Sequence, residues 1–328
     1  MLLTIAIPTY NRANRLEKSL IDLCAEINSS INKSSVSVYV SNNGSLDDTL
    51  GVIERCNKIF VKNCIPFSSN SFENNQGFDT NVFACYTKSN SDYVWILSDD
   101  DNIITGSIDV IIKDINKYHP SVIFYNNDQK PYSTSMPYIK QYKFYDEITS
   151  NNAVALKKIV DWPKLSSLVL QVFCEGLQIV NLNNGFMHIA LALHCSFQKG
   201  RVLHASTFTN RPDVDYMNHI DFTPYIFNGL NIYIKSILNA TNQMYLYEIL
   251  AYPYIDPLAS SLNTLGDYYC GRCALTIHLK QELLTTVYRE INHGWLRRLT
   301  SWMAVKMMFK FLFCIFYYFT IKPTKNNR

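Results

Sequence analysis

The stretch "DYVWILSDDD" (Asp92 to Asp101) decides how the fold is predicted, because a continuous apolar run passes directly into three carboxylates. Continuous apolar runs are typical of central strands that are buried on both faces of a parallel sheet. Three adjacent carboxylates repel one another and destabilise a fold unless a cation or a hydrogen-bond network offsets their charge. The alternative is a solvated loop or a helix cap. The stretch therefore predicts a buried strand that ends in a cation site or in a solvated acidic loop.

The residues before this stretch alternate between strand-like and helix-like patterns. "LLTIAI" (Leu2 to Ile7) predicts a buried strand that ends at Pro8, and "VSVYV" (Val36 to Val40) predicts a second strand. A short strand is expected near Ile65, and "SVIFY" (Ser121 to Tyr125) closes the set. Apolar residues at helical spacing lie between the strands: Leu16, Leu20, Leu23, Ile27, Leu50, Ile53 and Cys56. This alternation predicts an α/β fold with a mostly parallel central sheet.

Two helix starts carry capping signals. Asn14 with Glu17 forms a capping pair at the first helix, and Thr105 is placed to cap the helix after the acids. Beyond residue 125 the alternation becomes irregular, and residues 226–294 have a largely helical pattern. We therefore expect a mainly helical C-terminal region after the sheet.

Composition limits the classes of function. The 328 residues are 48% hydrophobic, which is enough for a substantial core. The formal net charge of +3 is unevenly distributed, because residues 295–328 hold seven basic residues and no acid. The body is therefore mildly acidic, which argues against nucleic acid as a partner. An odd number of cysteines, nine, and a chain that begins with a strand pattern in place of a signal peptide indicate a cytoplasmic protein.

The basic tail has its own pattern. "FLFCIFYYFTI" (Phe311 to Ile321) follows Lys306 and Lys310, which are one helical turn apart. As a helix this run is about 16 Å long, half of the ~30 Å hydrocarbon core of a bilayer. A helix that lies on an anionic membrane surface fits this pattern. The alternative is a terminal helix packed on the body with its basic side chains solvated.

Polar side chains follow three of the predicted strands. Thr9, Tyr10, Asn11 and Arg12 come after the first strand, Asn42 and Asn43 after the second, and Asp99, Asp100 and Asp101 after the fourth. Ligands of open α/β sheets bind at the carboxyl ends of the strands, so these clusters are expected to meet. Magnesium and manganese take oxygen ligands and usually bind one or two carboxylates together with substrate phosphates. A divalent metal with a diphosphate is therefore the ligand predicted here.

Four segments together resemble the family 2 glycosyltransferases of the GT-A fold. They are "IAIPTYNR" (Ile5 to Arg12), "VYVSNNGSLDDT" (Val38 to Thr49), "NNQGFDTNV" (Asn74 to Val82) and "DYVWILSDDDNI" (Asp92 to Ile103). They occur in the family's order across about the first 125 residues. "LSSLVL" (Leu165 to Leu170) and residues 185–206 look like the branch with abequosyltransferases and related O-antigen sugar transferases.

The resemblance implies roles for individual residues. The metal ligands are Asp100 and Asp101, and Mg²⁺ or Mn²⁺ is the implied ion. Residues that line the nucleotide-sugar pocket are Pro8, Thr9, Tyr10, Arg12, Asn42, Asn43, Gly77, Asp99 and Asp100. The chain departs from the family in two of these segments, because many relatives have Asp where Asn42 stands and Arg where Thr80 stands. An amide both donates and accepts, so Asn42 suits cytosine as well as uracil.

The catalytic base is a third departure. Inverting members of the family use an Asp near the start of a helix in the acceptor half, and the resemblance places His188 close to that position. A histidine can take a proton near neutral pH, and Glu175 is the carboxylate alternative. The other interpretation of His188 is a histidine that is hydrogen-bonded within the apolar segment Phe186 to Leu193. A retaining enzyme would need no such base.

The resemblance implies a hexosyltransferase or deoxyhexosyltransferase that acts in O-antigen lipopolysaccharide or other surface polysaccharide synthesis. Its partners would be a nucleoside-diphosphate sugar, a lipid-linked oligosaccharide and the anionic cytoplasmic face of the inner membrane. The expected parts are a nucleotide-sugar half (1–125), an acceptor half (126–225), a helical region (226–294) and a membrane-associating tail (295–328). Two alternatives remain at this point: a non-catalytic nucleotide-sugar-binding module at the membrane, and a nucleotidyltransferase.

Overall fold

The computed structural model describes residues 1–125, 142–147, 154–161, 164–173, 185–205, 210–212, 234–246 and 250. Met1–Asp215 and Tyr233–Leu250 form one compact unit, and every described residue belongs to it. The second unit, with the predicted tail, lies outside the described residues, as do Glu175 and most of the predicted helical region.

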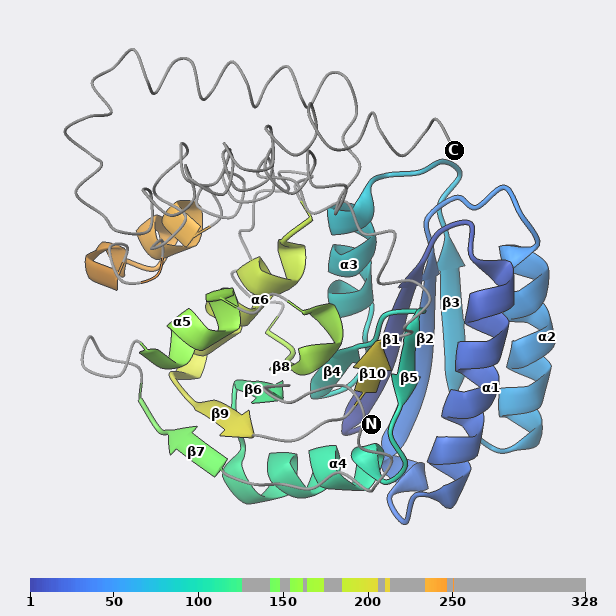
Figure 1. The fold of residues 1–328 in the computed structure, drawn as a ribbon, viewed down its shortest axis with the longest axis horizontal. Helices are drawn as coiled ribbons and strands as arrows, with labels where there is room; N and C mark the ends of the chain where they lie inside the picture. Colours follow the sequence, from blue (N-terminus) through green and yellow to red (C-terminus); the bar gives the residue numbers. More distant parts are fainter. Residues whose placement is uncertain are drawn as a thin grey trace, which may run out of the picture. The chain divides into compact units, whose positions relative to one another are not determined.

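The first strands and helices alternate along the chain as predicted (Figure 1). In chain order they are β1 (Leu3–Thr9), α1 (Ala13–Ser29), β2 (Val36–Asn42), α2 (Thr49–Lys62), β3 (Phe67–Ser71), α3 (Phe78–Thr87) and β4 (Tyr93–Ile96). The strands β3, β2, β1 and β4 lie side by side in that order and are all parallel. The order reverses at β1, so the polar residues after β1 and β4 meet at a topological switch point, where ligands of such sheets bind.

The sheet continues past β4 with strands from later in the chain. These are β8 (Leu168–Gln171), β6 (Val122–Tyr125), β9 (Val202–Ala205) and β7 (Tyr142–Tyr145), in that spatial order. β8 runs antiparallel to both β4 and β6, and β7 runs antiparallel to β9. The other six of the eight strands share one direction, so the predicted α/β fold with a mostly parallel sheet is confirmed.

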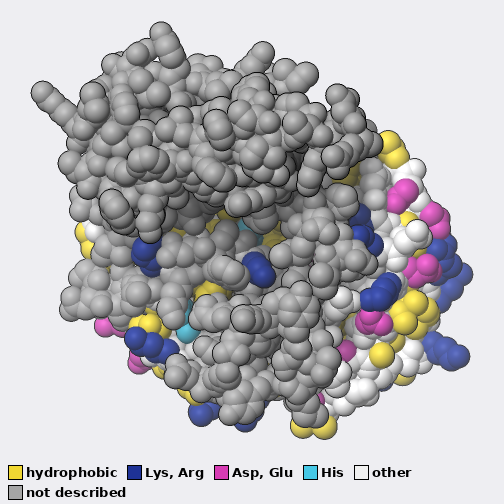
Figure 2. Space-filling view, viewed as in Figure 1, with side chains coloured by type: hydrophobic (Ala, Val, Ile, Leu, Met, Phe, Trp, Pro, Cys, Tyr) yellow, Lys and Arg dark blue, Asp and Glu magenta, His cyan; other side chains and the backbone are white. Residues whose placement is uncertain are grey.

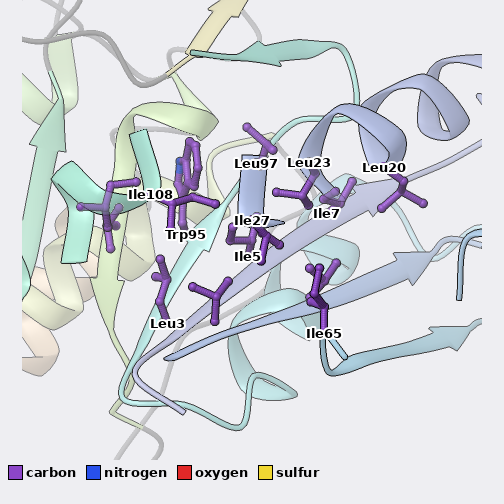
Figure 3. Close-up of a cluster of buried hydrophobic side chains, with 14 of the residues drawn as sticks. Leu3, Ile5, Ile7, Leu20, Leu23, Ile27, Ile65, Trp95, Leu97 and Ile108 are labelled. Atoms are coloured by element: carbon purple, nitrogen blue, oxygen red, sulfur yellow. The ribbon is translucent and has the colours of Figure 1, made fainter. Parts of the chain in front are cut away.

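Helices cover both faces of the sheet. Apolar side chains of α1, α2 and α4 (Ser107–Tyr118) form one core cluster with every second residue of the strands, including Ile5 and Trp95 (Figure 3). On the opposite face, α3 packs on β1, β2 and β4, while α6 (Met187–Lys199) packs on β6, β8 and α5 (Val154–Asp161). The predicted residues Leu16, Leu20, Leu23 and Ile27 are fully buried in this core. Leu50 is half exposed instead, because it lies one residue away from the buried stripe of α2.

The predicted helix caps are wrong, because side chains distant in sequence accept the hydrogen bonds of the amides at these helix starts. α1 starts at Ala13, after Arg12, and the Ala13 amide donates to the Asp47 carboxylate at 3.0 Å. α4 starts after Gly106, whose amide donates to Glu26 at 2.8 Å. Neither Asn14 nor Thr105 is the N-cap residue. Capping by a residue distant in sequence leaves no local signal.

The described surface carries no single-sign patch on the face drawn in Figure 2, where acidic and basic side chains lie next to one another. Among the helices that the structure describes, none is both long and apolar enough for a membrane span.

Candidate functional site at the carboxyl edge of the sheet

The register of β1 and β4 brings Thr9 and Asp99 together. Ala6 pairs with Ile96, and Thr9 and Asp99 each come three residues later in the chain, Asp99 in the loop after β4. The Thr9 hydroxyl donates to Asp99 Oδ2 at 2.7 Å. β1 runs through Pro8 to Thr9, one residue beyond the predicted end. Pro8 is tolerated there because β1 pairs with β4 only as far as Ala6, so its missing N–H removes no bond on that side.

Arg12 joins the first two acids. Its Nη1 lies 2.7 Å from Asp99 Oδ1 and 3.1 Å from Asp100 Oδ2. The Asp99 side chain is 3% exposed, so its charge is almost completely removed from water. Burial raises the pKa of Asp99, while the Arg12 charge and the Thr9 hydrogen bond oppose that rise. Both Asp99 oxygens therefore have donors from the protein, which suits a residue that fixes the loop better than a residue that holds an ion.

Asp100 and Asp101 have partners other than those of Asp99. Asp100 Oδ1 accepts a hydrogen bond from the Ser98 hydroxyl, and the Asp100 side chain is 14% exposed. Asp101 begins β5 (Asp101–Ile103), which pairs antiparallel with β10 (Asn210–Pro212) in a two-stranded sheet. The described residues contain no group of three His, Cys, Asp or Glu that could enclose a metal. Within the described part of the chain the donors are a pair of carboxylates, which fits an ion of the magnesium type that shares its shell with phosphate.

Asn42 and Asn43 are buried at the end of β2 and hold neighbouring loops. Asn42 Oδ1 accepts from the Ser45 amide at 3.1 Å, and its Nδ2 donates to the Ser71 hydroxyl at 2.9 Å. Asn43 Oδ1 accepts from the Gln76 amide at 2.8 Å, while its Nδ2 donates to the Gly77 carbonyl at 3.2 Å. Both amides therefore organise the backbone, and for Asn43 this role was not evident from the sequence.

The loops around these amides approach each other closely. Gly44 has φ +69°, and a Cβ at this position would lie 2.5 Å from the carbonyl carbon of Asn74. Gly77, with φ 85°, is the N-cap of α3. Glycine is required at Gly44 for both its backbone conformation and this contact. The predicted site residue Gly77 thus lies at the end of a loop that is held by Asn43, the residue after β2.

The loop after β1 is tied to the loop after β2. Asn11, at φ 52°, accepts from the Leu46 amide at 2.7 Å and donates its own amide to the Ser45 hydroxyl at 2.9 Å. Asn tolerates this left-handed conformation better than most residues. Tyr10, next to it, is exposed. The three predicted polar clusters consequently meet at one edge of the sheet.

His188 lies near the start of α6, between two aromatic rings. It is 4% exposed, with the Phe186 ring stacked at 6.2 Å between centroids and the Phe78 ring edge-on at 6.3 Å. The two rings make the surroundings of His188 largely apolar, and its role as a catalytic base stays a prediction.

Two site-adjacent residues were missed from the sequence. Asp79, in the first turn of α3, is 0% exposed and accepts from the Met187 amide at 3.1 Å. Asn81, two residues further along, donates to the Thr9 carbonyl at 3.3 Å. In the sequence, Asp79 and Asn81 stand out only as polar residues in a mostly apolar helix. This pattern does not identify their hydrogen-bond partners.

One protein-family model matches the first half of the chain. Residues 4–160, just under half of the chain, match the model of the family described as glycosyl transferase family 2. No curated protein sequence matches this chain.

Two solved structures share the fold over nearly the whole chain. Staphylococcus aureus TarS (residues 1–349) in complex with UDP-GlcNAc superposes with a TM-score of 0.54 at 13% identity, covering 97% of this chain and 91% of that chain. The mannosyltransferase PcManGT from Pyrobaculum calidifontis, in complex with GDP-Man and Mn²⁺, gives 0.52 at 12% identity, covering 98% and 87%. The chain therefore has the GT-A type of fold.

Proposed function

We propose that this chain is a glycosyltransferase that transfers one hexosyl or deoxyhexosyl group from a nucleoside-diphosphate sugar to a lipid-linked oligosaccharide. The observation that carries the proposal is the network of Thr9, Arg12, Asp99 and Asp100 at the switch point between β1 and β4. The family match over residues 4–160 supports the same activity. O-antigen or another surface polysaccharide is the proposed product, as in the abequosyltransferase branch that the sequence resembles.

Each residue of the network has a proposed task. Both carboxylate oxygens of Asp99 accept hydrogen bonds, from Thr9 and Arg12, and Asp99 is proposed to fix the acidic loop. Asp100 and Asp101 are therefore the proposed ligands of Mg²⁺ or Mn²⁺. When bound, the metal stabilises the charge on the departing diphosphate. Arg12 holds Asp100 in place and neutralises part of the acidic charge. The complex of PcManGT with GDP-Man and Mn²⁺ supports a metal and a nucleotide sugar for this chain.

The base of the nucleotide is proposed to lie beside Asn42. Its Oδ1 and Nδ2 each keep capacity for a second hydrogen bond in addition to the bonds with Ser45 and Ser71. An amide of this kind accommodates uracil or cytosine. TarS binds a uracil nucleotide and PcManGT a guanine nucleotide, so the base requires direct measurement.

The acceptor is proposed to bind on the α6 side, with His188 or Glu175 as the base that takes the proton of its hydroxyl. Separate His188→Ala and Glu175→Ala variants distinguish the two: loss of transfer with retained nucleotide binding identifies the base. The basic tail is proposed to hold the protein on the cytoplasmic face of the membrane. Deletion of residues 299–328 should release it from the membrane pellet, and a truncated protein that stays in the pellet contradicts this proposal.

The decisive experiment starts with a thermal-shift series of UDP, CDP, GDP and dTDP with Mn²⁺. One nucleotide should raise the melting temperature, and the corresponding nucleotide sugar should be hydrolysed slowly in the presence of the metal. Asp100→Ala and Asp101→Ala should abolish the hydrolysis. Asp22→Ala, at an exposed acid of α1, is the matched control and should retain it. Tight binding without hydrolysis, and without transfer to lipid-linked acceptors, would instead support the non-catalytic alternative.

A further inference from the structure

Asp79 is a buried carboxylate that connects two helices. It lies in the first turn of α3, is 0% exposed, and accepts a hydrogen bond through Oδ1 from the Met187 amide at 3.1 Å. Met187 is the first residue of α6. α3 packs on the strands β1, β2 and β4, whereas α6 packs on β6 and β8. The bond thus joins α3, which covers the strands of the proposed donor site, to α6 of the proposed acceptor half. Figure 1 shows where the two helices lie.

The start of α6 depends on this carboxylate. The N-cap residue Phe186 forms no side-chain capping bond, and α6 is buried from Met187 to Ser196. Amides in the first turn of a helix have no partner within the helix, and here water is excluded. A carboxylate at this position makes a charge-assisted hydrogen bond and also faces the positive end of the helix dipole. Asp79 therefore acts as the cap of α6, supplied from another helix.

The same contact positions the rings around His188. Phe78 precedes Asp79 in the chain, and Phe186 precedes Met187. Their rings contact His188 edge-on at 6.3 Å and stacked at 6.2 Å, respectively. On its other side, Phe78 follows Gly77, whose carbonyl accepts a hydrogen bond from Asn43 at 3.2 Å. A continuous chain of contacts therefore leads from the end of β2 to the start of α6.

We propose that Asp79 is a positioning residue that holds the start of α6, with His188, against the loop of the donor site. This proposal rests on the proposed transferase function. Asp79 is 0% exposed, so its effect is exerted through Met187 and the flanking rings. Its removal should disturb transfer to the acceptor more than it disturbs nucleotide binding.

The test uses the full chain and three variants. Asp79→Ala removes the bond, and Asp79→Asn keeps an oxygen that can accept it. Asp114→Ala is the matched control, because Asp114 is also a buried acid, 1% exposed, and it accepts from the Tyr125 hydroxyl at 3.0 Å on a different helix. Amide hydrogen exchange of residues 187–190 is measured without ligand. Exchange should be about tenfold faster in Asp79→Ala, the size expected for the loss of one helix cap, and near the wild-type rate in the other two.

The second measurement links the contact to function. Two quantities are measured for each variant. The first is the affinity for UDP, CDP, GDP or dTDP in the presence of Mn²⁺, determined by thermal shift. The second is the rate of sugar transfer to lipid-linked acceptors in a membrane extract. Asp79→Ala should lose about tenfold or more in transfer, as misplaced reacting groups do, while the nucleotide affinity changes little. Asp79→Asn should recover most of the transfer activity.

Three results would overturn the proposal. They are exchange in Asp79→Ala no faster than in Asp114→Ala, exchange in Asp79→Asn as fast as in Asp79→Ala, and a transfer loss that only follows a loss of nucleotide affinity. A wild-type protein that neither binds nucleotide nor transfers sugar refutes the proposed function. In that case the exchange comparison still decides whether Asp79 holds α6.

Discussion

Removal of the Arg12 side chain should expose how strongly the acidic loop depends on one cation. In Arg12→Ala, the carboxylate of Asp99, which is 3% exposed in the wild type, loses its ion pair and keeps only the Thr9 hydroxyl as a described side-chain donor. Asp100 then adds repulsion without an intervening positive charge. Breaking a buried ion pair from one side costs about 3–5 kcal/mol. Because the Arg12 side chain is 29% exposed and partly screened, we expect a loss of about 3 kcal/mol.

Urea denaturation at neutral pH measures this loss as a change in the free energy of unfolding. One nitrogen of Arg12, Nη1, contacts both carboxylates, so Arg12→Lys keeps a charge near them and should lose less than half as much. The double variant with Asp99→Asn should also be more stable than Arg12→Ala alone, because no uncompensated charge remains buried. Arg55→Ala is the control, since Arg55 forms ion pairs with exposed acids only.

The reasoning fails if Arg12→Ala unfolds within about 1 kcal/mol of the wild type, the range of a surface ion pair. It also fails if Asp99→Asn does not restore stability in the Arg12→Ala background. Either result would mean that Asp99 is compensated by groups other than Arg12.

Three further predictions concern the same edge of the sheet. Gly44→Ala should destabilise the protein by more than Gly106→Ala in urea denaturation: both have positive φ, which costs about 1–2 kcal/mol for alanine, but only at Gly44 does a Cβ meet backbone. Burial raises the pKa of Asp99, so between its unfolded value of about 3.9 and its folded value the native state binds more protons than the unfolded chain. The free energy of unfolding of the wild type, relative to that of Asp99→Asn, should therefore fall as pH rises through this window and level off above it. A relative stability that does not change with pH contradicts a raised pKa for Asp99. Metal removal with EDTA and Asp100→Ala should each lower the thermal shift produced by nucleoside diphosphate, and together they should do no more than either alone, whereas additive losses would place the metal elsewhere.

The sequence allowed the first half of the fold to be predicted because periodicity reports burial. Leu16, Leu20, Leu23 and Ile27 recur at helical spacing, and all four are buried against the sheet. The acids after β4 and the polar residues after β1 were placed at one edge by the rule for parallel strands, and the Thr9–Asp99 contact bears this out.

Other features depend on tertiary contacts that leave no local pattern. Nothing in "SSLVLQVF" distinguishes a parallel strand from the antiparallel β8. Asp47 and Glu26 cap helices that begin far from them in sequence, so the local candidates Asn14 and Thr105 were wrong. Asp79 could not be assigned a partner from sequence, because its partner amide is 108 residues away.

The position of β8 between β4 and β6 bears on how the chain folds during its synthesis. β4 and β6 do not pair with each other, and the strand that fills the space between them is made about 70 residues after β4, at about 5–20 residues per second. For several seconds an apolar strand edge has no partner from its own chain and can associate with other chains. A fragment that ends at Tyr125 keeps this open edge permanently, so we expect it to aggregate even though it contains nearly all of the proposed donor site.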